Sequence, residues 1–113
     1  MPEAGLWHLV PADSDEKAVP NHRVDIRLYP SPAPFRAAMV NRQTNADMPY
    51  AVATFDGRRL RLQMRAEAGR SQAEMPWLSM DWNGSRFEGT FLEPNGAPTE
   101  GSIQLKLIRG VAR

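Results

Sequence analysis

The chain has 113 residues, of which 42% are hydrophobic and 24% are charged. This length and composition predict one small globular domain over residues 1–113, and they exclude both a second core and a disordered chain. The 14 basic and 13 acidic residues give a formal net charge of +1 without a basic block, so no nucleic-acid partner is expected. Because the chain has no cysteine, disulfides, thiolate metal sites and cysteine nucleophiles are excluded.

The start of the chain bears on its location. The first ten residues carry neither a basic region nor a sustained apolar run, so they lack the pattern of a signal peptide. No stretch approaches the ~20 apolar residues that a membrane-spanning helix needs. We therefore expect no membrane span, and a cytoplasmic location if Met1 is the native start. A periplasmic location is expected if the chain is the mature part of a longer precursor.

The first two strands are predicted at Leu6–Val10 and Arg23–Tyr29, on either side of a polar loop at residues 11–20. In the second strand, aliphatic residues alternate with Asp25 and Arg27. A period of two places the aliphatic side chains on one face of a strand and the charged ones on the other. The sequence therefore predicts strands with one buried and one wet face.

Prolines at positions 30, 32 and 34 end the second strand, since proline cannot donate to a strand ladder. The segment Phe35–Val40 is compatible with a short helix or with a strand. We favour a strand over Phe35–Gln43, because it would supply a partner for a fourth strand at Tyr50–Phe55.

The dipeptide Asp56-Gly57 joins the fourth strand to a fifth at Arg58–Ala66. Such a dipeptide accepts positive φ at both central positions of a type I′ turn. A two-residue loop at this point predicts the cross-strand pairs Phe55 with Arg58, Ala53 with Leu60 and Ala51 with Leu62.

Asn83-Gly84 is predicted to join strands at Trp77–Trp82 and Ser85–Leu92 in the same way. This register pairs apolar residues on the dry face and opposite charges on the wet face, as a correct register requires. The predicted pairs are Met80 with Phe87, Leu78 with Gly89 and Asp81 with Arg86.

Two loops and a last strand complete the chain. The polar residues 66–75 have room for one helical turn, and residues 93–101, with two prolines and two glycines, predict a longer loop. The last strand is predicted at Ser102–Arg109. Eight consecutive strands with mostly short connections predict an all-β fold, a single eight-stranded antiparallel up-and-down barrel.

Residues at both ends of the chain carry a resemblance to a known family. Gly5-Leu6-Trp7 opens the first strand, and Arg109 stands near the end of the last. The chain resembles the calycins, which comprise lipocalins, fatty-acid-binding proteins and avidins, and it is most similar to a compact bacterial lipocalin-like or avidin-like domain. The resemblance implies that Trp7 packs over one end of the barrel against Arg109 of the closing strand. The T-D-Y-like motif of lipocalins and the biotin-contacting residues of avidin are not found in the chain.

The sequence offers little support for catalysis, a metal or a cofactor. The histidines His8 and His22 have no partner at a metal-binding spacing, and Ser85 lies in a predicted hairpin tip rather than in a nucleophile elbow. No glycine-rich phosphate loop precedes a helix. We therefore expect a protein that is not an enzyme. The carboxylates in the strands are predicted to point away from the barrel interior: Asp25, Asp81 and Glu88.

A basic stripe is predicted on one outer face, formed by Arg59, Arg61 and Arg65, with Arg27 and Arg36 as candidate neighbours. It is compatible with contact to an anionic partner or with an ordinary solvated strand face. No aromatic residues interleave with the stripe for base stacking, so we favour the solvated face.

The predicted interior is apolar, and it is where we expect a function. An eight-stranded barrel is just wide enough to be filled by side chains or to hold one small ligand. Alanines leave room inside and methionines adapt to a guest. The first hypothesis is therefore non-enzymatic binding of a small hydrophobic molecule among Met39, Ala51, Ala53, Met64, Met80, Trp82 and Phe87.

The alternative hypothesis is a structural or protein-interaction barrel with a filled core, which associates through an outer sheet face. Alternation places Tyr50, Val52 and Trp77 on an outer face, where exposed apolar side chains mark a subunit contact. These three residues form the predicted homodimer contact, although the position of Trp77 also suits a cover over the barrel mouth.

Overall fold

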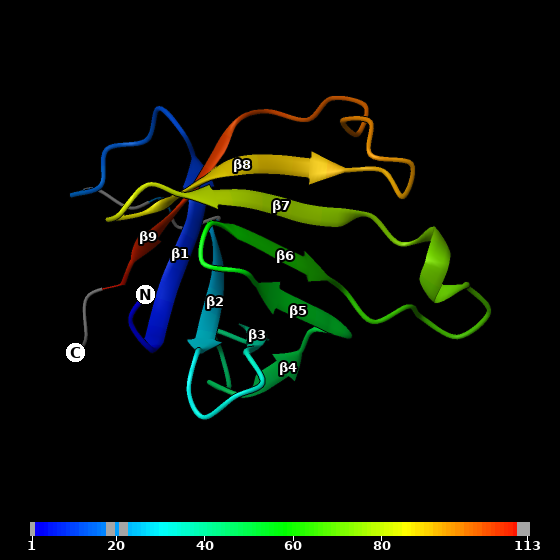
Figure 1. The fold of residues 1–113 in the computed structure, drawn as a ribbon, viewed down its shortest axis with the longest axis horizontal. Coiled ribbons are helices and arrows are strands. Elements are labelled where there is room, and N and C mark those ends of the chain that lie inside the picture. The colour runs from blue at the N-terminus through cyan, green and yellow to red at the C-terminus, as the bar shows by residue number, and fades with distance from the viewer. Residues whose placement is uncertain (1, 18–19, 21–22, 111–113) are drawn as a thin grey trace.

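The computed structural model describes residues 2–17, 20 and 23–110, and it is an all-β fold (Figure 1). The helical structure among these residues is one 3-10 turn, η1, at Gln72–Glu74. No helix in the described part of the chain is long and apolar enough to cross a membrane. The nine strands are β1 Gly5–Pro11, β2 Val24–Tyr29, β3 Arg36–Val40, β4 Asp47–Pro49, β5 Val52–Phe55, β6 Arg59–Gln63, β7 Trp77–Trp82, β8 Phe87–Leu92 and β9 Leu105–Arg109.

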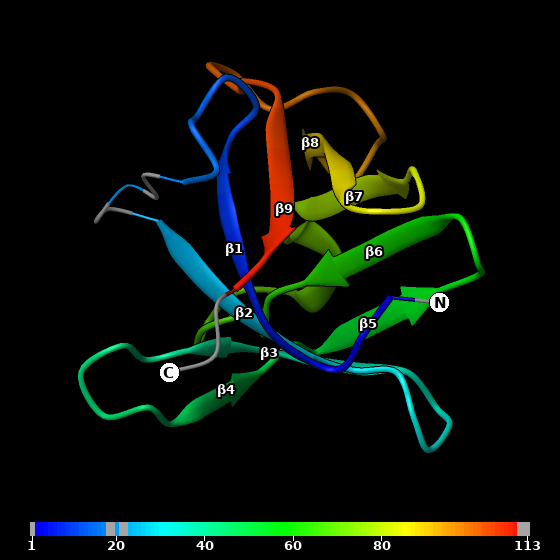
Figure 2. The same cartoon turned by 90° about the vertical axis from the view of Figure 1, so that its left-hand side faces the viewer.

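The strands form one antiparallel sheet in the order β4-β3-β2-β1-β9-β8-β7-β6-β5. The first strand therefore pairs with the last, with Trp7 opposite Arg109 and Leu9 opposite Leu107. Figure 2 shows β1 and β9 side by side, with the other strands curling away on both sides of them. The curled sheet is a half-barrel whose two edges are β4 and β5.

The structure has an open nine-stranded sheet where the sequence predicted eight strands in a closed barrel. The reason is that residues 47–55 form two strands on either side of Tyr50, and only the second of them lies within the predicted strand Tyr50–Phe55. Upstream, β4 pairs with β3, and downstream, β5 pairs with β6. At the crossing, the Tyr50 N–H donates to the carbonyl of Ala37 in β3, and the next N–H, of Ala51, donates to Gln63 of β6. The two edge strands diverge from this point.

The Phe35–Val40 segment contains a strand rather than a helix, because β3 pairs with β2 on one side and β4 on the other. It ends before the predicted Gln43. The Asn41 side chain accepts the N–H groups of the second and third residues that follow it, and Asn45 has a φ of 59°. These two asparagines turn the chain back into β4.

The first tight hairpin exists, but its register differs by two residues from the prediction, because Phe55 lies opposite Leu60 rather than Arg58. The Asp56 carboxylate accepts the N–H groups of the second and third residues after it. Asp56 therefore begins the turn, and Gly57, with a φ of 102°, is its first central residue. A shift of two keeps every side chain on its predicted face. The observed pairs are Val52 with Gln63, Ala53 with Leu62, Thr54 with Arg61 and Phe55 with Leu60.

The second hairpin differs from its prediction for the same reason. The Asn83 side-chain oxygen accepts the N–H groups of Ser85 and Arg86, so Asn83 begins the turn and Gly84, with a φ of 102°, follows it. The predicted pairs of Met80 with Phe87, Leu78 with Gly89 and Asp81 with Arg86 are therefore wrong. The observed pairs are Leu78 with Phe91, Met80 with Gly89, Asp81 with Glu88 and Trp82 with Phe87.

Large apolar side chains fill the inner face of the half-barrel. An aromatic cluster lies among them, with the Phe87 ring centroid 5.7 Å from that of Trp7 and 4.8 Å from that of Trp82. Fully burying one such side chain contributes roughly 1.5–3 kcal/mol. The members of this inner-face cluster that are 2% exposed or less are Trp7, Ile26, Leu28, Leu60, Leu62, Leu78, Met80, Phe87 and Leu107.

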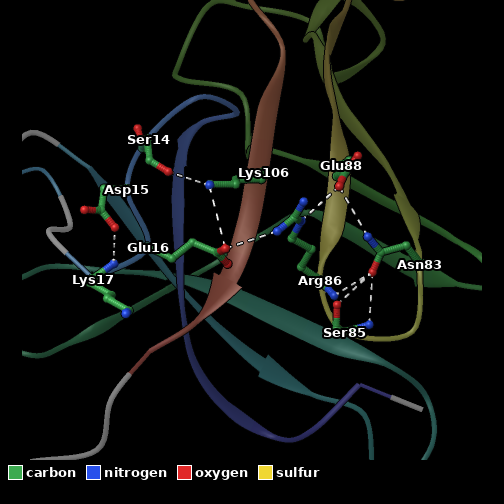
Figure 3. Close-up of polar contacts among 9 residues, drawn as sticks. All are labelled: Ser14, Asp15, Glu16, Lys17, Asn83, Ser85, Arg86, Glu88 and Lys106. Carbon is green, nitrogen blue, oxygen red and sulfur yellow. Dashed lines mark hydrogen bonds and ion pairs between the residues drawn. The ribbon is translucent and has the colours of Figure 1, made fainter.

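Lys106 of β9 holds a polar loop against the outer face (Figure 3). Its ammonium group donates to the backbone carbonyl of Ser14 at 2.6 Å and lies 4.0 Å from the Glu16 carboxylate. Glu16 also pairs with Arg86 at 3.1 Å, which connects the loop to the β7–β8 hairpin. Lys106 is itself buried, with 5% of its surface exposed. The loop shields its ammonium group from solvent and also supplies a carbonyl and a carboxylate that interact with it.

The polar connection between β6 and β7 contains the single helical turn that the sequence predicted. The Gln63 side chain donates to the carbonyls of Gln72 and Met75. Gln72 in turn donates to the carbonyl of Met64 and accepts the N–H of Ala66. These glutamine bonds hold η1 against the end of β6.

Candidate functional site

A groove of about 710 Å³ lies where β4 and β5 diverge. We call it the seam groove, because one wall comes from β3 and β4 and the other from β5. Its volume falls within the roughly 300–1,000 Å³ that is typical of small-molecule sites. The lining residues are Tyr29, Pro34, Phe35, Arg36, Ala37, Ala38, Asp47, Pro49, Tyr50, Ala51, Val52 and Ala53.

Aromatic side chains connect the seam groove to the core. The rings of Phe35, which precedes β3, and Phe55, which ends β5, approach to 5.8 Å between centroids. Phe55 continues to Phe87 at 5.7 Å in an edge-to-face arrangement. Tyr50 also packs against the buried core. The backbone gap between β3 and β5 is therefore bridged by apolar rings.

The polar rim of the seam groove centres on Asp47 of β4. Its carboxylate accepts hydrogen bonds from the Tyr29 hydroxyl and the Arg27 guanidinium. The bond to Asp47 raises the pKa of the Tyr29 phenol. Arg36 lies over the Tyr29 ring, with its guanidinium carbon 5.3 Å from the ring centroid. Asp47 is thus neutralised by Arg27, while Arg36 makes no ion pair within the described part of the chain.

Tyr50 places a phenol in the wall of the seam groove. Burial raises the pKa of its hydroxyl well above the ordinary value of 10.0, because a buried phenolate loses its hydration. That hydroxyl makes no hydrogen bond with a residue that the structure describes. It therefore remains a neutral donor and acceptor for a molecule in the groove.

The structure distributes the predicted ligand-binding residues among three environments. Ala51 and Ala53 line the seam groove. Met80 and Phe87 are buried in the core, at 1% and 0% exposure, and their neighbours fill the space around them. The remaining three are half-buried and lie outside the lining of the seam groove: Met39, Met64 and Trp82.

The three residues of the predicted homodimer contact do not all lie on one outward surface. Tyr50 packs inward against the core, because its N–H binds β3 at the crossing where the strand alternation breaks. Its expected outward placement is therefore wrong. Trp77 is on the outer face and half-buried, with the Arg61 guanidinium carbon 4.3 Å from its ring centroid. Val52 lies opposite Gln63 in the register.

The predicted contact between Trp7 and Arg109 is confirmed. The two residues are cross-strand partners, and the guanidinium carbon lies 5.9 Å from the Trp7 ring centroid. Arg109 also donates to the Leu6 carbonyl and the Glu3 carboxylate. Gly5 has a φ of 120°, a backbone conformation that L side chains rarely adopt, so this positive φ favours glycine beside the Arg109 guanidinium. A hollow of about 310 Å³ lies beside this closure.

A buried ionic cluster on the outer face was missed by sequence reasoning. The His8 Nδ1 atom lies 2.7 Å from the Asp25 carboxylate, and the Arg23 Nε atom donates to the same oxygen at 2.8 Å. Arg42 lies 3.7 Å from the other oxygen. His8 and Asp25 are 8% and 5% exposed. Asp25 does face away from the core, as predicted, but it lies beneath other residues instead of in solvent.

The described residues contain no group of three or more histidine, cysteine or acidic side chains that could hold a metal ion. His22 lies outside them. Two members of the predicted basic stripe have partners, since Arg59 pairs with Asp81 at 3.0 Å and Arg61 covers Trp77. Arg65 is exposed. Two of the three arginines of the stripe are therefore engaged in contacts with neighbouring strands.

Removing the carboxylate of Asp25 should destabilise the protein strongly. Asp25→Ala leaves the buried His8 and the half-buried Arg23 without the carboxylate that they share, and breaking a buried pair costs about 3 kcal/mol. Asp81→Ala removes a carboxylate from an exposed pair and should have little effect. Urea unfolding of both variants measures the difference. Equal losses in the two variants would show that the outer-face cluster does not stabilise the fold.

The buried phenol of Tyr50 should make stability fall in alkaline solution. The unfolded phenol ionises near its ordinary pKa of 10.0, whereas the folded one stays protonated to higher pH. The unfolded state then binds fewer protons, so unfolding free energy falls above about pH 10, by up to about 1.4 kcal/mol per pH unit. Tyr50→Phe should reduce this slope to the smaller part that the raised pKa of Tyr29 contributes, and Tyr29→Phe should retain the larger part. Parallel alkaline curves for wild type and Tyr50→Phe would contradict the burial of Tyr50.

A scan against protein-family models, a search of curated proteins and a search of solved structures each found no match to this chain.

Proposed function

We propose that this protein is a non-enzymatic binding module that takes a small hydrophobic molecule in the seam groove. The observation that supports this most directly is the groove itself, a hollow of about 710 Å³ in which alanine, proline and aromatic side chains stand beside the polar groups of Tyr29, Arg36, Asp47 and Tyr50. Concave sites of this size, with mostly apolar walls and a small number of polar anchors, are typical of small-molecule binding.

The proposal moves the ligand from the predicted interior to the open side of the half-barrel. Leu60, Leu62 and Phe87 are 0–1% exposed, so their neighbours already occupy the interior that a guest would need. An interior at native packing density has few voids larger than a water molecule. Ala51 and Ala53 remain in the proposed site, and Phe35 and Tyr50 join them.

We also propose that the fold is a calycin-like, lipocalin- or avidin-like barrel with an opened seam. The meander order and the pairing of the first strand with the last support this relation. The contact of Trp7 with Arg109, with Gly5 beneath it, supports it further. On this proposal, β4 and β5 correspond to one barrel strand that is divided at Tyr50.

The alternative proposal is an interaction barrel with a filled core, and the tight packing around Phe87 favours it. Its contact surface would lie on the outer face of β7, where Trp77 is half-buried under Arg61. Sedimentation at micromolar concentration distinguishes the two, because this alternative requires association and the groove proposal does not.

Titration with a neutral hydrophobic dye such as Nile red tests the groove proposal. Dye fluorescence should rise on binding, and Ala51→Leu should weaken the affinity about tenfold, or about 1.4 kcal/mol, because a larger side chain occupies the exposed wall of the groove. The dye is neutral, so the result does not depend on the charges at the rim.

Two variants serve as controls for the titration. Ala73→Leu makes the same change at an exposed alanine in η1 and should leave the affinity unchanged. Met80→Leu alters the interior with little change in volume and should also leave it unchanged. If Met80→Leu weakens binding and Ala51→Leu does not, the ligand lies in the interior and the groove proposal is wrong.

A further inference from the structure

The two edges of the sheet differ in how they are protected from pairing with another strand. Natural edge strands carry charges or proline, or are very short. β4 has all three features, since it consists of Asp47, Met48 and Pro49. β5 is also short, with four residues, but its sequence Val-Ala-Thr-Phe contains neither charge nor proline. β5 is therefore an exposed edge with the composition of a strand that is paired on both sides.

The register indicates which backbone groups of β5 are unpaired. The Asp56 N–H donates to the Arg59 carbonyl at the end of the hairpin. Because antiparallel pairs alternate between bonded and non-bonded positions, Thr54 is the next residue bonded to β6. The N–H and C=O groups of Ala53 and Phe55 then point away from β6, toward the seam.

The opposite wall of the seam cannot satisfy these groups. It begins with a segment that has proline at positions 30, 32 and 34, and proline has no N–H to donate. β3 does reach across the seam at the Ala37 carbonyl, but that carbonyl accepts the N–H of Tyr50. An added strand is the partner that fits a row of unpaired backbone groups on a sheet edge.

The charged residues beside the β5 edge indicate which kind of partner strand it would bind. Arg36 on the opposite wall and Arg58 in the turn after β5 flank the edge, while Arg61, opposite Thr54 in β6, lies over Trp77 of β7. None of them makes an ion pair with a carboxylate in the described part of the chain. Of the nearby carboxylates, Asp47 is neutralised by Arg27, while Asp56 accepts the N–H groups of its turn and keeps one negative charge, which the arginines exceed.

From this arrangement we infer that the β5 edge binds an acidic peptide segment in extended conformation, as an added antiparallel or parallel strand. Pairing with a second copy of the chain would bring two sets of these arginines together, and like charges at an interface are unfavourable. An acidic partner would instead place carboxylates beside these arginines, and this attraction favours binding. This surface goes beyond the proposed function, because it is a polypeptide site that uses backbone groups instead of the apolar floor of the groove.

Binding of a synthetic peptide to the intact protein tests the inference. The probe is an end-blocked peptide of about eight residues in which glutamate alternates with valine, and calorimetry measures its affinity. We expect binding that weakens with salt, and no binding of the matched peptide with lysine in place of glutamate. Arg36→Glu should weaken binding about tenfold. Arg70→Glu makes the same charge change at an exposed arginine in the η1 connection and should leave binding nearly unchanged.

Backbone pairing is tested separately from charge. Ala53→Pro removes an N–H that points away from β6, which an edge strand tolerates, and should abolish peptide binding. A glutamate–valine peptide with every backbone nitrogen methylated keeps the charge but has no N–H to donate from either edge, so it should not bind wild-type protein. This second measurement does not depend on the folding of the proline variant. Absence of binding by the unmodified peptide, equal binding of the methylated peptide, or dimerisation through β5 in sedimentation would each overturn the inference.

Discussion

The fold depends on the place where one chain segment binds two sheet edges in succession. Tyr50 donates its N–H to β3 and Ala51 donates its N–H to β6. These adjacent bonds hold the edges near each other, but a single residue step cannot keep β4 and β5 in one ladder. The strands therefore diverge, and their divergence creates the seam groove. In the middle of the sheet there is no such gap, because β1 and β9 pair along their length and Arg109 covers Trp7.

Packing inside the half-barrel determines where a ligand has room. In this chain of 113 residues one sheet carries the core of the described structure, and its inner face is filled around Phe87, Trp7 and Trp82. Cores lose stability when their packing is disturbed by even one methylene. The space that remains is at the seam, where small alanines line the wall and Phe35 meets Phe55. The curled sheet therefore has a filled inner face, and it leaves open space for a ligand at the seam between β4 and β5.

The sequence predicted the parts of this structure that depend on local pattern. Alternation located the strands, and the resemblance led to the contact of Trp7 with Arg109. The hairpin registers failed because an Asx-Gly pair gives the same local signal whether the Asx residue begins the turn or occupies its centre, and Asp56 begins it. The cluster of His8 with Asp25 joins residues 17 positions apart, which no short motif reveals. Tyr50 was placed outward because alternation breaks at the crossing, and the seam groove was missed for the same reason.

The central claim is that the ligand site lies at the seam and not within the barrel. Amide chemical shifts during a titration with Nile red test it most directly, because they report the position of the ligand along the whole chain. The account predicts that the largest shifts fall on Phe35, Tyr50, Ala51 and Ala53, which share the seam groove. Shifts concentrated instead on the core residues Leu62, Met80, Phe87 and Leu107 would contradict it.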